Sequence, residues 1–430
     1  MRRLSLCTLA LVLLAGAPTA HAAGWSRPFS HQAGSAAFDE PVPRVAVAAD
    51  GTSVASYAQR GQIYAVTADA RGRFGRPQRL GRWAAITSAV AAGRGGAALV
   101  AWEARDGIRV AVRRRSGRRL TTRRLAGSTG SPLNDLAVQV DPRGGWFLIE
   151  SEFVAKTRQN RVRTFTLRAD GTPALKPQPL GPGRFGAEAR PVRALAVDDR
   201  GHATAVFNGP DGVLAAQGIH QGRFGPPAAF GGASITDPRV TASRDGDGRA
   251  LVAATMSGRC GDAGCAGQPV AARLDHTGRP VPFAVPALEH PGRAFGPSIA
   301  PLRSGAAALV FSLKAAPSAF SRLAPVKAVV LRDGAAPGAL QTLTAKAAAE
   351  PIAATLSRGR VLVIWSGKRG FGAALAGSDG RFRKTAQPPG PPPEPYHSNP
   401  TNRAVATAGS YALVGWSRSG RVRLTLRRFG

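Results

Sequence analysis

The sequence repeats a short apolar phrase that ends in an aromatic residue. The phrase reads "ALVAW" at 98–102, "VLVIW" at 361–365 and "ALVGW" at 412–416. Where neighbouring copies both carry the aromatic residue, the spacings are 45, 54 and 51 residues. The aromatic ends of these phrases are Tyr57, Trp102, Phe207, Phe311, Trp365 and Trp416. A fixed place at the end of an apolar run favours core packing over sugar binding for these side chains.

Each repeat contains the same four segments in the same order. Two apolar strands are joined by a glycine turn, a third strand alternates, and a Gly/Pro-rich connector leads to a short fourth strand. The second copy reads "ITSAVAAGRGGAALVAWEARDGIRVAVRRRSGRRLTTRRLAG". Four strands at a period of about 40–50 residues are typical of propeller blades. We therefore predict an all-β chain: one β-propeller of four-stranded antiparallel blades over residues 24–430, with eight blades, or seven as the alternative.

The eighth copy stops after its third strand, at "RRFG". In the first and fourth copies "GRFG" is followed by a fourth strand that contains proline, "RPQRLG" and "PPAAFGG". Residues 24–32, "GWSRPFSHQ", supply a comparable segment. We predict that this N-terminal segment is the outermost strand of the last blade, which would close the ring and remove an open sheet edge.

In this pattern the chain resembles exported bacterial β-propeller repeat proteins, over essentially all of residues 24–430. Among enzymes it is similar in pattern to sialidase-like propellers, without a diagnostic motif. That resemblance implies turns of the Asp-box type, an arginine cluster and a Tyr/Glu pair. "SRDGDG" at 243–248 matches an Asp-box only in part, because its glycines fall at other offsets. The resemblance thus implies a glycan-active hydrolase or lyase only as an alternative.

The first residues have the features of a signal peptide. Arg2 and Arg3 precede an apolar run from Leu4 to Gly16, and "AHA" at 20–22 is a small-x-small cleavage pattern. We expect residues 1–23 to be removed, with cleavage near Ala22 or Ala23. The apolar run is shorter than the roughly 20 residues of a membrane-spanning helix. The expected product is secreted, extracellular or associated with the cell envelope, without a transmembrane segment.

Two cysteines follow the signal peptide, Cys260 and Cys265 in "CGDAGC". In an exported chain they predict one disulfide across a hairpin tip. A metal pair would need two further ligands, and the six later histidines lie apart from these cysteines and from one another. We expect no metal, no cofactor and a monomer. "QPPGPPPEP" at 387–395 predicts a polyproline-prone linker between blades.

The chain is strongly basic, with 58 Lys and Arg against 25 Asp and Glu and a formal net charge of +33. In the third strands arginines alternate with apolar residues, as Arg109 and Arg113 do with Val110 and Val112. Such alternation places the arginines on one face, the outer wall of the ring. This surface would attract anionic polymers. The alternative is that arginine usage reflects a GC-rich genome.

Candidate site residues are sparse. An acidic or polar residue precedes proline before the first strand of several blades: Glu40, Asp237, Glu350 and Asn399. They are interpreted as a turn device, or alternatively as a ring at the channel mouth. No serine-nucleophile elbow, paired-histidine motif or phosphate loop is present. We predict a non-catalytic binding or scaffold module, for anionic polymers or cell-surface components; the alternative is the hydrolase or lyase, with its catalytic residues unassigned.

Overall fold

The computed structural model describes the chain from residue 24 onward. Described are residues 24–430 except 33–42, 83–87, 116, 118, 129–132, 155, 158, 184–191, 199, 210–211, 219–222, 231–234, 243–248, 262–263, 276–278, 289–293, 314–323, 368–369, 390–402 and 419–420. No helix in these ranges has the length and hydropathy to cross a membrane. Because residues 390–402 fall outside the described ranges, most of the predicted linker at 387–395 is not described.

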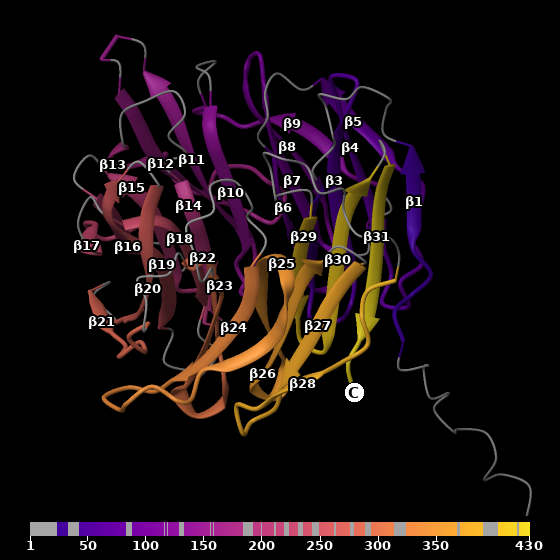
Figure 1. Ribbon diagram of the computed structural model, residues 1–430. Coiled ribbons are helices and arrows are strands. Elements are labelled where there is room, and N and C mark those ends of the chain that lie inside the picture. Colours follow the sequence, from indigo (N-terminus) through magenta and orange to yellow (C-terminus); the bar gives the residue numbers. More distant parts are fainter. Residues whose placement is uncertain are drawn as a thin grey trace, which may run out of the picture.

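The chain is all-β, and its strands form a single β-propeller (Figure 1). The first five sheets in sequence order, sheets 1 to 5, have four antiparallel strands each. Sheet 1 comprises β2 (Arg44–Val47), β3 (Ser53–Gln59), β4 (Gln62–Ala68) and β5 (Gln78–Arg82). Sheet 2 comprises β6 (Ser88–Ala92), β7 (Ala98–Ala104), β8 (Gly107–Arg113) and β9 (Thr121–Arg124). Sheet 3 comprises β10 (Leu133–Val140), β11 (Trp146–Val154), β12 (Gln159–Leu167) and β13 (Gln178–Gly183).

Sheet 4 comprises β14 (Val192–Val197), β15 (Ala203–Gly209), β16 (Gly212–Gly218) and β17 (Ala228–Phe230). Sheet 5 comprises β18 (Ile235–Ala242), β19 (Ala250–Gly261), β20 (Gly264–Leu274) and β21 (Pro280–Pro282). Sheet 6 has seven strands, β22 (Ala294–Pro301), β23 (Ala307–Leu313), β24 (Ala324–Leu331), β25 (Gln341–Leu356), β26 (Arg360–Gly367), β27 (Gly370–Ala376) and β28 (Phe382–Lys384). Sheet 7 comprises β29 (Arg403–Ala408), β30 (Tyr411–Arg418), β31 (Arg421–Arg428) and β1 (Phe29–Gln32). Single-turn 3-10 helices lie at η1 (Arg94–Gly96), η2 (Arg303–Gly305) and η3 (Ser357–Gly359).

The described strands make seven hydrogen-bonded sheets, a number equal to the alternative of seven blades and one fewer than the expected eight. The difference arises at β25, a continuous strand of 16 residues. Its first part pairs with β24, up to the pair of Ala324 with Ala348, and its second part pairs with β26 from Ala348 to Leu356. The segment "AKAAA" at 345–349 contains no Gly or Pro, so nothing in the sequence breaks the strand there.

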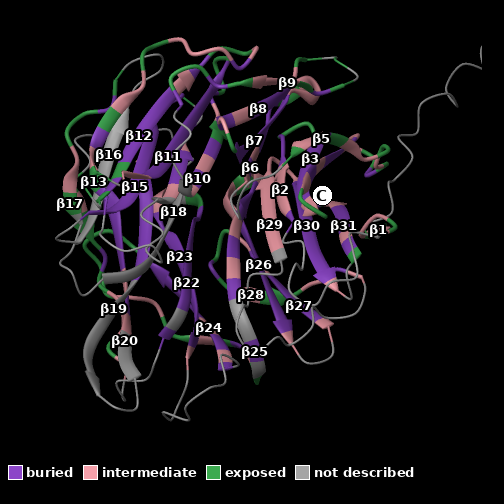
Figure 2. Cartoon of the chain, turned by 90° about the horizontal axis from the view of Figure 1, so that it is seen from above, coloured by how far each residue is buried: buried purple, intermediate pink, exposed green. Residues whose placement is uncertain are grey.

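The innermost strands contact one another around the ring. The contacts run in order through β2, β6, β10, β14, β18, β22, β25 and β29, and β29 contacts β2 again. Figure 2 shows the buried residues concentrated along the strands and the exposed ones at turns and outer edges.

The N-terminal segment closes the ring, as predicted. β1 pairs antiparallel with β31, from Phe29 opposite Leu424 to Gln32 opposite Arg421, and lies beside it in Figure 1. Sheet 7 therefore combines the two ends of the described chain.

The core lies between sheets and not within one sheet. Each repeated aromatic residue stands four or five positions after the first residue of the second strand of its sheet, or of its half of sheet 6. It packs against the preceding strands: Trp102, for example, belongs to a cluster with Val54, Ile63 and Leu80 of sheet 1. Tyr57, Trp102, Phe207, Phe311, Trp365 and Trp416 are all buried. Side chains buried this deeply offer no surface to a sugar.

Candidate functional site

The residues predicted for the channel mouth are described only in part. Glu40 and Asn399 lie outside the described residues. The backbones of Asp237 and Glu350 lie in β18 and β25, and their side chains are outside the described part. A ring of carboxylates at the channel therefore stays a prediction.

The Asp-Pro and Glu-Pro pairs lie inside strands, not in the connections between blades where we expected them. The pairing shifts register between Thr236 and Arg239 in β18, and between Ala349 and Ile352 in β25. Each shift spans a proline, which has no N–H to donate to the ladder, so the strand bulges there.

Most of the described aspartates stabilise turns. In each, Oδ1 accepts the backbone N–H of the residue two positions later, which forms an Asx turn. Hydrogen bonds from the hydroxyl and the backbone N–H of Thr172 lower the pKa of Asp170. The aspartates that form these Asx turns are Asp50, Asp69, Asp141, Asp170, Asp198 and Asp379. Such carboxylates have a structural role that accounts for their place in the sequence.

Sheet 3 has a carboxylate where sheets 1, 2, 4, 6 and 7 have the aromatic residue. Counted from the start of β11, Glu150 takes the place that Trp102 takes in β7, and pairs with Leu136 as Trp102 pairs with Ser88. The Glu150 side chain is fully buried. Sequence reasoning missed this position because "WFLIESEFV" does not end in the repeated phrase.

An arginine from the neighbouring strand pairs with this carboxylate. Arg163 Nε on β12 donates to Glu150 Oε1 at 2.7 Å, and Arg163 Nη2 lies 3.0 Å from Glu152 Oε2. Its Nη1 donates to the Gly127 carbonyl of the preceding connection at 3.3 Å. Burial raises the pKa of the Glu150 carboxyl to about 7, against the opposing effect of the Arg163 charge.

This pair of carboxylates has no access to a substrate. Glu150 is 0% and Glu152 1% exposed, and both bind guanidinium groups. Glycoside hydrolysis needs two carboxyl groups on either side of an accessible scissile bond. The cluster therefore joins sheets 2 and 3 and gives no support to the hydrolase alternative. Nor is any group of three His, Cys, Asp or Glu among the described residues placed to hold a metal ion.

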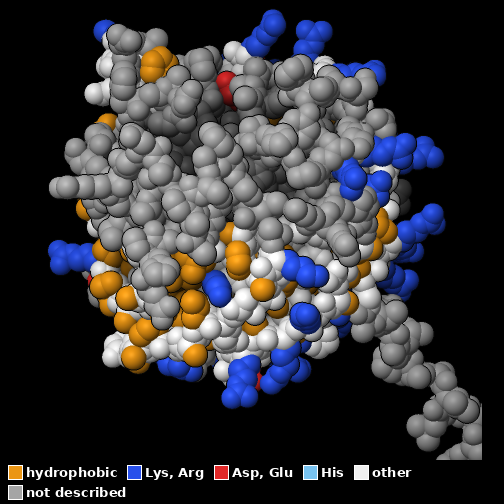
Figure 3. All heavy atoms as spheres, in the orientation of Figure 1, with side chains coloured by type: hydrophobic (Ala, Val, Ile, Leu, Met, Phe, Trp, Pro, Cys, Tyr) orange, Lys and Arg blue, Asp and Glu red, His pale blue; other side chains and the backbone are white. Residues whose placement is uncertain are grey.

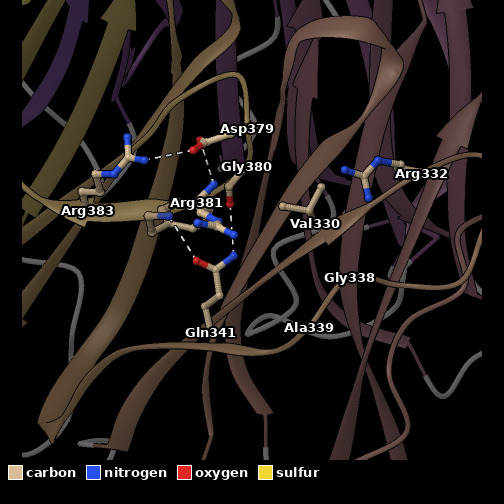
Figure 4. Close-up of a pocket in the computed structure, with 10 residues that line it drawn as sticks. Val330, Arg332, Gly338, Ala339, Gln341, Asp379, Gly380, Arg381 and Arg383 are labelled. Carbon is tan, nitrogen blue, oxygen red and sulfur yellow. Dashed lines mark hydrogen bonds and ion pairs between the residues drawn. The ribbon is translucent and has the colours of Figure 1, made fainter.

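The structure contains a cleft in sheet 6 that the sequence did not reveal. It has a volume of about 510 Å3 and lies between the end of β24, the start of β25 and the turn from β27 to β28 (Figure 4). Its charged side chains are Arg332, Asp379, Arg381 and Arg383. The rest of the lining is Val330, Gly338, Ala339, Gln341, Gly380 and Phe382.

Arginines stand on two sides of this cleft. Arg332 follows β24, and Arg381 and Arg383 follow β27 on the other side, as Figure 4 shows. Asp379 Oδ2 lies 3.1 Å from Arg383 Nη2, and its Oδ1 accepts the Arg381 N–H at 3.0 Å. Within the described part of the chain, the Arg332 and Arg381 side chains form no ion pair. The cleft thus carries three arginines against one acid, Asp379, and the guanidinium groups of Arg332 and Arg381 are in no ion pair among the described residues.

A glutamine holds the two sides of the cleft together. Gln341 Nε2 donates to the Gly380 carbonyl at 3.1 Å, and Gln341 Oε1 accepts the Phe382 N–H at 3.1 Å. Gly380 has φ +72°, and an added Cβ would lie 2.7 Å from Val330 Cγ2. Glycine is therefore required there both by the backbone and by the space available.

The same glutamine clamp joins other parts of the ring. Gln78 in β5 pairs with the backbone of Leu120 in sheet 2, and Gln178 in β13 pairs with that of Phe224 in sheet 4. The recurring "PQ" of "RPQRLG" and "KPQPLG" was the available signal for two of these clamps.

No protein-family model matches the sequence, and no curated protein resembles it. Solved structures resemble its fold. A prolyl endopeptidase is 12% identical over 88% of this chain and 55% of that one, with a TM-score of 0.47, so this chain spans about half of that enzyme. The polysaccharide lyase Uly1 is 11% identical over 78% of this chain and 88% of that one, with a TM-score of 0.50. An alpha-L-arabinanase of Penicillium chrysogenum, solved with arabinobiose, is 12% identical over 93% and 96%, with a TM-score of 0.43. At such identities the similarity concerns the fold alone.

Proposed function

We propose that this propeller is an exported, non-catalytic binding module for anionic polymers, and that the arginine cleft of sheet 6 is its main contact. Residues 1–23 are its signal peptide in this proposal. The observation that carries it is the pair Arg332 and Arg381, which line one cleft and form no ion pair among the described residues, while the one acid of the lining, Asp379, pairs with Arg383. Guanidinium groups bind carboxylate, sulfate and phosphate through directed, charge-assisted hydrogen bonds.

The rest of the surface supports this function. Lys and Arg side chains project around much of the face in Figure 3, where few acids are visible. With a formal net charge of +33, the chain attracts polyanions from a distance and the cleft then provides a defined contact. Binding of this kind weakens as salt screens the exposed charges.

The test is the affinity for heparin of three forms of residues 24–430. In the cleft variant, Arg332→Ala and Arg381→Ala are combined. In the control, Arg71→Ala and Arg76→Ala remove the same charge from exposed positions at the turn after β4. Loss of two arginine contacts at about 1 kcal/mol each should weaken binding at least about tenfold. The control should change it by less than about threefold. Equal loss in both variants would contradict a specific contact at the cleft.

We also propose that the ring has eight blades, with sheet 6 formed by two of them that share β25. Two observations support this count. β25 contacts both β22 and β29, as the innermost strands of neighbouring sheets do elsewhere in the ring. The clamp of Gln341 on the β27–β28 turn repeats the link that Gln78 and Gln178 make between successive sheets. A variant Ala347→Pro would separate the halves of β25 while leaving an eight-bladed ring folded.

We propose the disulfide between Cys260 and Cys265 as well. The two residues are direct partners in the pairing of β19 with β20. Directly opposed residues of antiparallel strands have Cα atoms about 4.5–5.5 Å apart, within the range that a disulfide spans. The mass of the secreted protein under non-reducing conditions, two hydrogens below that of the reduced chain, would support the bond.

A further inference from the structure

We propose that the cleft recognises an acidic sugar unit of a polysaccharide, with the oxyanion held between Arg332 and Arg381 and the sugar ring against Phe382. The inference rests on the proposed function and narrows its ligand class. It is carried by the composition of the lining, which combines the guanidinium groups of Arg332 and Arg381 with the apolar side chains of Val330, Ala339 and Phe382, here called the floor. An anionic chain without rings would not use these apolar side chains.

The two arginines that line the cleft without an ion pair determine where the anion lies. Arg332 and Arg381 come from different turns and reach the cleft from two sides. An oxyanion between them accepts hydrogen bonds from both, while Asp379 keeps Arg383 in place at 3.1 Å. Carboxylate and sulfate both have the oxygens for such a contact, and the planar guanidinium suits carboxylate in a bidentate arrangement.

The apolar side chains of the lining indicate what kind of molecule carries the anion. Phe382 is half-buried, packs against the core of sheet 6 and lines the cleft beside Val330 and Ala339. Binding sites for small organic units combine such apolar surfaces with a few polar groups that fix orientation. The apolar C–H face of a sugar ring is complementary to this floor.

The turn that carries these side chains is fixed before any ligand arrives. The Gln341 clamp and the Asp379 Asx turn together hold the backbone from Gly380 to Phe382 with hydrogen bonds of 3.0–3.1 Å. A preformed site avoids the entropy cost of ordering a loop on binding. This favours recognition of one unit over diffuse attraction alone.

Nucleic acid fits the described surface less well. Proteins that hold single strands stack bases on exposed aromatic side chains. The lining of the cleft has a single aromatic residue, the half-buried Phe382, so it offers no row of aromatic side chains for successive bases. A nucleic acid would still contact the arginines through its phosphates, but these contacts do not use the apolar side chains of the cleft.

The experiment compares four probes on the wild-type chain, the Arg332→Ala/Arg381→Ala variant and the Arg71→Ala/Arg76→Ala control. The probes are oligogalacturonate for carboxylate, dextran sulfate for sulfate, polyphosphate and single-stranded DNA, with affinities measured by calorimetry at one salt concentration. We expect the cleft variant to lose about tenfold or more on one or both saccharides and less than about threefold on polyphosphate and DNA. The two saccharide arms identify the oxyanion.

A second variant tests the floor. Phe382→Leu keeps the charge, so it should weaken saccharide binding about threefold or more and leave polyphosphate binding unchanged, with thermal melting as the check of folding. Equal losses on all four probes, or the largest loss on DNA, would overturn the sugar assignment and leave the anion-binding function in place. No loss on any probe would overturn both.

Discussion

At the scale of single residues, the informative position is Glu150. The repeat predicts an aromatic residue there, and a row that lacks one gives no sign of what replaces it. The replacement became clear only from pairing, because Arg163 comes from β12 and Gly127 from the preceding connection. The six aromatic positions could be predicted from the sequence because the second strand of those repeats is a buried apolar run that ends in an aromatic residue.

Glu150 makes stability depend on pH. Its folded pKa of about 7 lies above the ordinary value of 4.5, so the folded chain holds this proton more tightly than the unfolded chain. Its contribution is fully present below pH 4.5 and is lost as pH rises through 7. Urea unfolding at pH 5 and pH 8 should show wild type losing on the order of 2–3 kcal/mol more than Glu150→Gln between the two. Parallel pH profiles for the two proteins would refute this.

At the scale of elements, the closing strand and the glutamine clamps hold the blades together. The pairing of β1 with β31 was predictable, because an unpaired edge and a matching segment stood at the two ends. The cleft was not predictable, because its lining comes from two turns far apart in the sequence, and arginine is too common in this chain to mark a site. The continuity of β25 was missed because four-stranded repeats imply a break between blades.

The closing strand should supply much of the stability. Beyond its pairing, His31 Nδ1 lies 2.9 Å from Tyr57 Oη, and Trp25 packs edge-on against Phe429. Deleting residues 25–32 should lower the melting temperature by about 10 °C or more, since several buried contacts and one sheet edge are affected. Tyr57→Phe, which removes the hydroxyl alone, should cost only about 1 kcal/mol. An unchanged melting temperature after the deletion would mean that closure adds nothing.

The glutamine clamp should be measurable at a site away from the cleft. Gln178 bonds both the carbonyl and the N–H of Phe224, at 2.7 and 2.8 Å. Gln178→Ala leaves both backbone groups without these partners and should cost about 1–3 kcal/mol in urea unfolding. Gln178→Glu keeps the acceptor and should cost less. A loss equal to that of an exposed Gln159→Ala control, within about 0.5 kcal/mol, would show the clamp to be dispensable.

At the scale of the whole molecule, the all-β propeller was predictable from the repeat period, and the function was not. A propeller serves many chemistries, so the fold does not identify a ligand. The net charge indicates only that partners are anionic, whereas the cleft of sheet 6 is a defined position at which one anionic group can bind. The central claim is therefore that sheet 6 holds an anionic ligand between Arg332 and Arg381.

A crystal structure of residues 24–430 with a bound acidic oligosaccharide tests this claim most directly. We expect an oxyanion within hydrogen-bond distance, about 2.7–3.2 Å, of guanidinium nitrogens of both Arg332 and Arg381. The sugar ring should lie against Phe382. An oligosaccharide ordered at the central channel, with the cleft of sheet 6 unoccupied at saturating ligand, would contradict it.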